Sequence, residues 1–154
     1  MIGKSVPRVD AYEKVTGRAK FTDDMILDKC LVAKVCHATI GNGIVKSIDT
    51  SEAEALDGVV KVVTFKDVPN HCYPTPGHPW SVELAHQDVA DRNLLTGRVR
   101  YYGDDIAAVV AEDEVTASRA LKLIKVEYEE YPVVLSPRLS MRGSEHPIHL
   151  DKKD

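Results

Sequence analysis

Hydrophobic residues along this chain gather in short runs separated by turn residues, a pattern that predicts β-strands. Such runs are too short for typical helices, and the run at 59–65 is especially rich in β-branched valine. Gly41-Asn42-Gly43 and Gly103 lie between successive runs, where glycine can supply the positive φ angles of a turn. We therefore expect returning, antiparallel strands. The expected strands cover 31–37, 44–48, 59–65, 99–102, 105–111 and 126–131.

Two segments have the pattern of helices. Ser51 and Glu54 have the spacing of a capping box, and Gly58 can end that helix in the left-handed conformation, so we predict a short helix near 51–57. A longer helix is predicted near 114–125, because its apolar residues recur at helical spacing. That stripe consists of Ala117, Ala120, Leu121 and Ile124. Together these elements predict an α+β fold with a mixed or antiparallel sheet and two helices.

Three other stretches lack such periodicity. Residues 1–20 are interrupted by Pro7 and Gly17 and are interpreted as an extended N-terminal arm over other structure, with a mobile tail as the alternative. Residues 136–154 are polar and are interpreted as a linker, which leaves 21–135 as the folded domain. Between 66 and 93 four prolines fall within eleven positions. A loop of that length is usually functional or becomes ordered with a partner.

Composition and charge exclude several classes of protein. The 154 residues suffice for one domain, and the net charge of −4 comes without a basic stripe, which argues against nucleic-acid binding. No apolar run approaches the roughly 20 residues that span a bilayer, and the N-terminus lacks the apolar region of a signal peptide. The three cysteines, Cys30, Cys36 and Cys72, form no paired framework. We therefore expect a cytoplasmic protein.

Histidine and cysteine residues offer little sign of chemistry. His71, Cys72 and His78 lie in the proline-rich loop, but structural zinc sites usually show closely paired ligands, so a small metal-binding protein is the least favoured alternative. Cys36 and His37 are neighbours on a predicted strand and would face opposite sides of the sheet. We expect Cys36 to act as a small buried hydrophobic residue instead of a nucleophile.

Acidic residues and glycines give no specific motif either. The adjacent carboxylates Asp23-Asp24 and Asp104-Asp105 are expected to cap helices or to be solvated, although paired carboxylates can serve acid–base catalysis. Alternation along 126–131 places Glu127, Glu129 and Tyr131 on one side, which we interpret as the solvated face of an edge strand. Neither a dinucleotide fingerprint nor a phosphate-binding loop is present. The residues alone therefore indicate a fold without indicating its function.

Five stretches of the chain, taken in order, resemble one family: Arg8–Asp24, Ile48–Ala53, Gly58–Pro69, Val99–Ala111 with Val126–Pro132, and His146–His149. They resemble the N-terminal α/β-hammerhead domain of the molybdenum-binding subunit of xanthine dehydrogenases, within the molybdenum hydroxylases that include the aldehyde oxidases. Several further segments, His78–Trp80, Gln87–Arg92 and Gly97–Asp105, are most similar to the bacterial xanthine dehydrogenase-like branch.

The resemblance implies hydroxylation of a purine or aldehyde carbon with oxygen derived from water. It implies a molybdopterin centre in the full subunit, with iron–sulfur clusters and FAD on partner domains or subunits. The pterin-binding residues and the catalytic base of the family belong to C-terminal domains, so no catalytic, cofactor-binding or metal-binding residue is assigned here. The chain is then expected to be inactive alone, to dock the iron–sulfur portion, and to be capable of self-association through bare interfaces. A free-standing interaction module without catalysis is the alternative.

In this family the segment after the Asp-Val-Pro motif runs near the substrate entrance, which implies an entrance loop at 70–80. Tyr73, His78 and Trp80 would supply its walls, with domain packing as the alternative role. The chain also departs from many relatives. It has His37-Ala38-Thr39 where they carry Arg-Ser-Pro, and Gly103-Asp104-Asp105 where they often carry Gly-Gln-Pro or Gly-Glu-Pro. The second departure falls in a turn, and little effect is expected from it.

Overall fold

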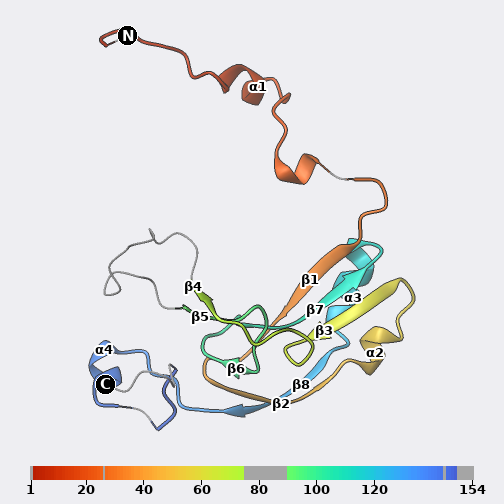
Figure 1. Ribbon diagram of the computed structural model, residues 1–154, viewed down its shortest axis with the longest axis vertical. Helices are drawn as coiled ribbons and strands as arrows, with labels where there is room; N and C mark the ends of the chain where they lie inside the picture. The colour runs from red at the N-terminus through yellow and green to blue at the C-terminus, as the bar shows by residue number, and fades with distance from the viewer. Residues whose placement is uncertain (1, 26, 75–89, 144, 149–154) are drawn as a thin grey trace. The chain divides into compact units, whose positions relative to one another are not determined.

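The computed structural model describes residues 2–25, 27–74, 90–143 and 145–148 (Figure 1). The chain divides into two compact units, residues 1–30 and 31–154. The first contains α1 (Ala11–Val15) and a 3₁₀ turn (Thr22–Asp24). The second contains β1 (Val32–His37), β2 (Gly43–Asp49), α2 (Ser51–Glu54), β3 (Val59–Thr64), β4 (Tyr73–Pro74), β5 (Ala90–Arg92), β6 (Arg98–Val99), β7 (Asp105–Ala111), α3 (Glu114–Leu121), β8 (Lys125–Glu130) and α4 (Pro137–Ser140).

The strands of the second unit pair only in the antiparallel sense within the described residues, which confirms the α+β prediction. They form a sheet of order β1-β7-β3, a sheet of order β6-β2-β8 and the small pair β4-β5. The predicted hairpins are wrong, because β1 and β2 lie in different sheets, as do β6 and β7. Strand β7 is apolar on both faces, so it is placed in the centre of its sheet between β1 and β3 instead of at a hairpin edge.

Gly43 explains why the turn at 41–43 does not return the chain as a hairpin. It begins β2, and a Cβ atom there would collide with the backbone oxygen of Glu129 on β8 and with the side chain of Ile40. The glycine therefore permits the close approach of β2 to β8. The glycines of this turn suggested a hairpin, but the close packing of β8, a strand distant in the sequence, determines where a glycine is required.

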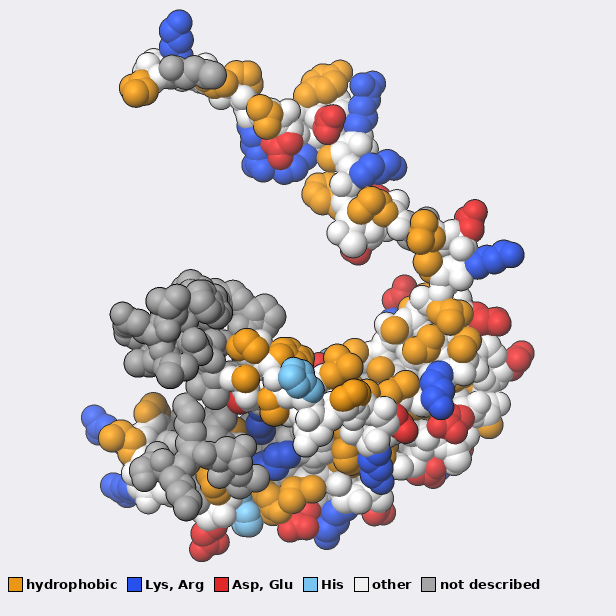
Figure 2. Space-filling model, in the orientation of Figure 1, with side chains coloured by type: hydrophobic (Ala, Val, Ile, Leu, Met, Phe, Trp, Pro, Cys, Tyr) orange, Lys and Arg blue, Asp and Glu red, His pale blue; other side chains and the backbone are white. Residues whose placement is uncertain are grey.

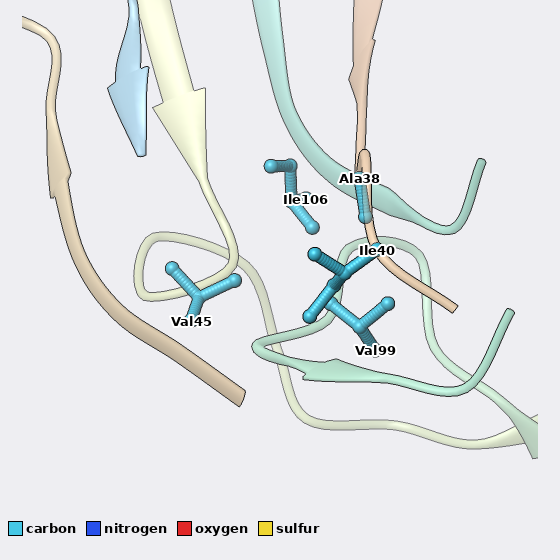
Figure 3. Packing of buried hydrophobic residues seen from close by; sticks show 5 residues of the cluster. All are labelled: Ala38, Ile40, Val45, Val99 and Ile106. Atoms are coloured by element: carbon cyan, nitrogen blue, oxygen red, sulfur yellow. The ribbon is translucent and has the colours of Figure 1, made fainter. Parts of the chain in front are cut away.

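Two clusters of buried residues form the core. The first contains Ala38, Ile40, Val45, Val99 and Ile106 and draws on both larger sheets. Figure 3 shows Ala38, Ile40 and Val99 gathered beside Ile106. The second contains Ala53, Val62, Val109 and Ala120 and lies between the β1-β7-β3 sheet and helices α2 and α3. One face of that sheet is thus covered by helices.

Helix α3 confirms the longer predicted helix but ends at Leu121, because the chain enters β8 at Lys125. Its N-cap is Asp113, whose carboxylate accepts the Thr116 backbone N–H at 2.9 Å and the Thr116 hydroxyl at 2.7 Å. These two bonds hold the pKa of Asp113 below its usual value. Ala117 and Ala120, from the predicted stripe, are fully buried.

Helix α2 is shorter than predicted and lacks the expected capping box. Thr50 is the N-cap, and its hydroxyl donates to the Glu54 carboxylate at 2.9 Å. Asp49 instead accepts the Ser51 backbone N–H at 3.0 Å and the Ser51 hydroxyl at 2.7 Å. The Ser51 hydroxyl is therefore used by the preceding carboxylate. Gly58 does adopt the predicted left-handed conformation, with φ of +85°.

The terminal segments contain more structure than the sequence suggested. Helix α1 interrupts the predicted extended arm, where Asp10 pairs with Lys14 one turn later at 2.7 Å. No residue of α1 is buried. Helix α4 interrupts the predicted linker, with Pro137 in its first turn. In the part of the chain that the structure covers, no helix has the length and apolar character needed to cross a membrane.

Candidate functional site

The base of the long loop is the pair β4-β5. Tyr73 pairs in register with Arg92, and the Asn93 amide donates to the Asn70 side chain at 2.7 Å, so the two arms of the loop are joined. The Tyr73 hydroxyl donates to the Asn93 carbonyl at 3.4 Å. The other two predicted entrance residues, His78 and Trp80, lie outside the described residues. Tyr73 is thus the one predicted site residue that the structure locates, and it lies at the loop base.

Two arginines connect this loop base to the turn at 100–104. Arg100 donates from Nη1 to the Asp91 carbonyl, and Arg92 donates from Nη1 to the Tyr101 hydroxyl at 2.9 Å. The Arg92 guanidinium also lies 5.3 Å from the centre of the Tyr101 ring, within cation–π distance. Two side-chain hydrogen bonds therefore link strand β5 to the turn at 100–104, which precedes β7.

Asp104 is buried, contrary to the expectation that this turn carries a solvated or capping carboxylate of little effect. Its side chain accepts the Arg100 backbone N–H at 3.1 Å and the Arg100 Nε–H at 3.4 Å. Only 3% of the residue is exposed. The carboxylate is drawn inward because a guanidinium four residues earlier neutralises it. An arginine four residues before an aspartate, across a glycine turn, is the sequence signal that could have indicated this pair.

Its neighbour Asp105 faces a different partner. The Asp105 carboxylate lies 2.9 Å from His37 Nδ1, and both side chains are well exposed. His37 is therefore directed to Asp105 across the β1-β7 ladder and away from Cys36. Cys36 is half-buried and packs against the first core cluster, and this burial raises the pKa of its thiol. The prediction that Cys36 is a packing residue is confirmed.

Arg98 binds the strand ends and the C-terminal segment together. Its Nη1 donates to Asn42 Oδ1 at 2.7 Å and to the carbonyls of Gly43 at 3.0 Å and Val99 at 2.5 Å. Its Nη2 donates to the Pro147 carbonyl at 3.0 Å. Burial lowers the pKa of Arg98 from its usual value. The segment at 145–148, predicted as linker, is thus attached to the β6-β2-β8 sheet.

Aromatic stacking strengthens this attachment. The Tyr131 ring stacks on His146 with centroids 3.8 Å apart and an interplanar angle of 8°. The Arg98 guanidinium lies 5.6 Å from the same Tyr131 ring. Asn42, which is almost fully buried, donates to the Pro132 carbonyl at 2.9 Å. The Asn42, Arg98, Tyr131 and His146 group therefore fixes the point at which the chain leaves the sheet.

The acidic segments behave mostly as structural surface. In β8 the alternation is as predicted, with Val126 and Tyr128 inward against the core and Glu127 and Glu129 exposed on an edge strand. Asp24 caps the 3₁₀ turn by accepting the Phe21 backbone N–H at 3.0 Å. Among the described residues no group of three or more His, Cys, Asp or Glu side chains could hold a metal ion.

One face of the β1-β7-β3 sheet is largely apolar, with Lys61 beside Val110, and among the described residues of the second unit it is only partly covered. Side chains paired across the strands share this face, and all of them are at least partly exposed. Figure 2 shows hydrophobic side chains gathered over β1 and β7. We call this surface the open face, and its members are Ala33, Val35, Val63, Ala108 and Val110. An uncovered apolar sheet face is typical of a surface that another protein part covers.

Comparisons with known proteins agree on one family. A family model described as aldehyde oxidase and xanthine dehydrogenase, a/b hammerhead domain, matches residues 16–132. The xanthine dehydrogenase molybdenum-binding subunit of Escherichia coli O157:H7 is 43% identical over 142 residues, which cover 92% of this chain and 19% of that protein. The carbon monoxide dehydrogenase large chain of Afipia carboxidovorans is 31% identical, over 96% of this chain and 17% of that protein. The crystal structure of the aldehyde oxidoreductase from Desulfovibrio desulfuricans superimposes with a TM-score of 0.79 at 32% identity, over 96% of this chain and 17% of that one.

Proposed function

The chain belongs to the aldehyde oxidase and xanthine dehydrogenase family as its α/β-hammerhead domain, and on this basis we propose that it serves as a structural part of a larger xanthine dehydrogenase-like molybdenum hydroxylase. It spans about a fifth of the length of the curated relatives it matches. The larger enzyme would hydroxylate a purine or aldehyde carbon with oxygen derived from water. The role of this domain is to dock the iron–sulfur portion and to support the substrate entrance.

Molybdopterin, the iron–sulfur clusters and FAD are assigned to other parts of the enzyme. The residues present do not fit an iron–sulfur cluster, which takes four cysteine ligands, because the chain has three cysteines and Cys36 packs in the core. The side chains of Arg92 and Arg100 near the loop base are already bonded to protein oxygens. No catalytic step is therefore derived for this domain.

The open face is the observation that carries the docking role. The opposite face of the same sheet is covered by α2 and α3, whereas Val35 on the open face is 38% exposed. By contrast, the outer face of the β6-β2-β8 sheet carries charged pairs, such as Lys46 with Glu129. One sheet thus presents an apolar surface and the other a solvated surface, and the apolar one is suited to a protein interface.

The docking role is tested by Val35→Glu in the complete subunit, produced with its iron–sulfur and flavin partners. An unpaired carboxylate buried in the interface should weaken association about a hundredfold or more. The measurement is the iron content of the purified complex, together with its elution volume in size-exclusion chromatography. Ile44→Glu is the matched control, because Ile44 is 39% exposed on the charged sheet. A complex that keeps its iron in Val35→Glu, as the control does, refutes docking through this face.

The isolated 154-residue chain is predicted to oxidise neither xanthine nor aldehydes. The reason is that the proposed reaction needs cofactors bound by other domains. Purified chain should also show no flavin or iron–sulfur absorbance in the visible range. Turnover above the rate of a buffer control would contradict the assignment of the chemistry to other parts of the enzyme.

The entrance role concerns the loop between Asn70 and Trp80. It is supported by the two-stranded base at β4-β5, where strand pairing and the bond from the Asn93 amide to the Asn70 side chain hold 70–74 beside 90–93. Tyr73, His78 and Trp80 are proposed to line the path of the substrate. The steady-state measurement described below tests this role through KM.

A further inference from the structure

Two side-chain hydrogen bonds connect the turn at 100–104 to the loop base: Arg100 donates to the Asp91 carbonyl, and Arg92 of β5 donates to the Tyr101 hydroxyl. We propose that Asp104 is a positioning residue, which sets the place of β5 and thereby of the loop base by fixing the guanidinium of Arg100. The consequence for substrate access rests on the proposed entrance role of the loop. The positioning itself does not depend on that role.

Asp104 fixes Arg100 from two directions. The carboxylate oxygen Oδ2 accepts both the backbone N–H and the Nε–H of Arg100, so that main chain and side chain are held together. Nη1 is then directed to the Asp91 carbonyl. The two side chains are 4% and 12% exposed, so solvent scarcely competes for these bonds. Removing one partner of such a buried pair leaves an uncompensated charge.

Backbone hydrogen bonds hold the turn that contains Asp104 against the buried core. The Ala38 backbone N–H donates to the Asp104 carbonyl at 2.8 Å, and the Gly103 N–H donates to the Ala38 carbonyl at 2.9 Å. Ala38 belongs to the first core cluster and is 1% exposed. Gly103 adopts a φ of +94°, which glycine tolerates, and it thereby turns the chain back over Ala38. The loop base is thus connected to the core through Asp104.

A second side-chain hydrogen bond also links β5 to the turn at 100–104. Arg92 on β5 donates to the Tyr101 hydroxyl, and burial raises the pKa of Tyr101, which keeps that hydroxyl neutral. The Tyr101 hydroxyl also interacts with the Asp104 carboxylate, but its bond with Arg92 does not involve Arg100. Removal of the Tyr101 hydroxyl therefore loosens the loop base while the ion pair between Arg100 and Asp104 stays in place.

The test is Asp104→Asn in the 154-residue chain, followed by hydrogen–deuterium exchange of peptides that contain β4 and β5. We expect exchange about tenfold faster in β5. The control is Asp105→Asn, which changes an adjacent aspartate that bonds to His37 instead. Unchanged exchange in a folded Asp104→Asn chain overturns the proposal. Should that variant not fold, Tyr101→Phe removes the acceptor of Arg92 and should raise β5 exchange about threefold.

A double variant separates positioning from simple stability. Asp104→Asn with Arg100→Gln restores a neutral buried pair, so its urea midpoint should return towards that of the unmodified chain. Glutamine is too short to reach Asp91 from position 100, so exchange in β5 should stay fast. If the urea midpoint and the slow exchange of β5 both recovered, the pair would only stabilise the fold. That result would overturn the positioning role.

Steady-state kinetics of the complete enzyme complete the test. If the loop lines the entrance, Asp104→Asn should raise KM for xanthine several-fold while kcat changes by less than about twofold. Faster β5 exchange with unchanged KM would support positioning and refute the entrance role of the loop. A raised KM without faster exchange would refute positioning by Asp104.

Discussion

Ile106→Ala should lower the free energy of unfolding by about 3 kcal/mol, within the range of roughly 2–5 kcal/mol for large-to-small changes in cores. Ile106 has no exposed surface and belongs to β7. Its cluster also contains Val45 of β2 and Val99 of β6, so the side chain packs where the two larger sheets meet. Its truncation leaves a cavity between two sheets that, among the described strands, share no hydrogen-bonded pair.

Urea denaturation followed by circular dichroism measures this loss. Ile44→Ala removes the same atoms from a position that is 39% exposed, and its cost should be under about 1 kcal/mol. A similar loss in both variants would mean that Ile106 does not join the sheets. The slope against urea concentration should stay unchanged in both, since the folded chain keeps its compactness.

Most strand positions were predictable from this sequence, whereas strand partners were not. The strand predicted at 99–102 is wrong, because the chain leaves β6 after Val99 and turns at 101–103. The run at 105–111 predicts β7 to the residue, because a strand apolar on both faces has few other environments. Its partners β1 and β3 come from much earlier in the chain, and no local signal specifies them. The glycines at 41 and 43 suggested a hairpin, yet Gly43 is needed for contact with Glu129 on β8. A glycine in a turn indicates only that the backbone requires its small size or conformational freedom at that point. This requirement can arise from packing against a strand that is distant in the sequence.

The polar groups that organise the candidate site were harder to predict. Asp104 and Arg98 look like surface residues in a sequence, since charged residues are rarely buried. Their burial depends on partners: Arg100 for Asp104, and Asn42 with two carbonyls for Arg98. By contrast, the packing role of Cys36 followed from strand alternation alone. Family resemblance indicated where a loop should lie, but not which charges hold its base.

Arg98→Met should lower the free energy of unfolding by about 3 kcal/mol or more, because hydrogen bonds to charged groups contribute about 1.5–3 kcal/mol each. Methionine keeps much of the volume and removes every donor. Asn42 Oδ1 would then lose its Arg98 donor at a residue that is 4% exposed. Arg119→Met is the matched control, since Arg119 lies exposed on α3 and should change stability by less than about 0.5 kcal/mol.

The same variant separates two functions of Arg98. Its bonds to Asn42, Gly43 and Val99 join strand ends, whereas its bond to Pro147 holds the C-terminal segment. Hydrogen exchange in Arg98→Met should therefore rise at 145–148 even in the absence of urea. Tyr131→Leu removes the ring that stacks on His146 and lies beside Arg98 but keeps the hydrogen bonds of Arg98, so it should raise exchange there with a smaller loss of stability. Equal protection of 145–148 in all three chains would mean that neither residue holds the segment.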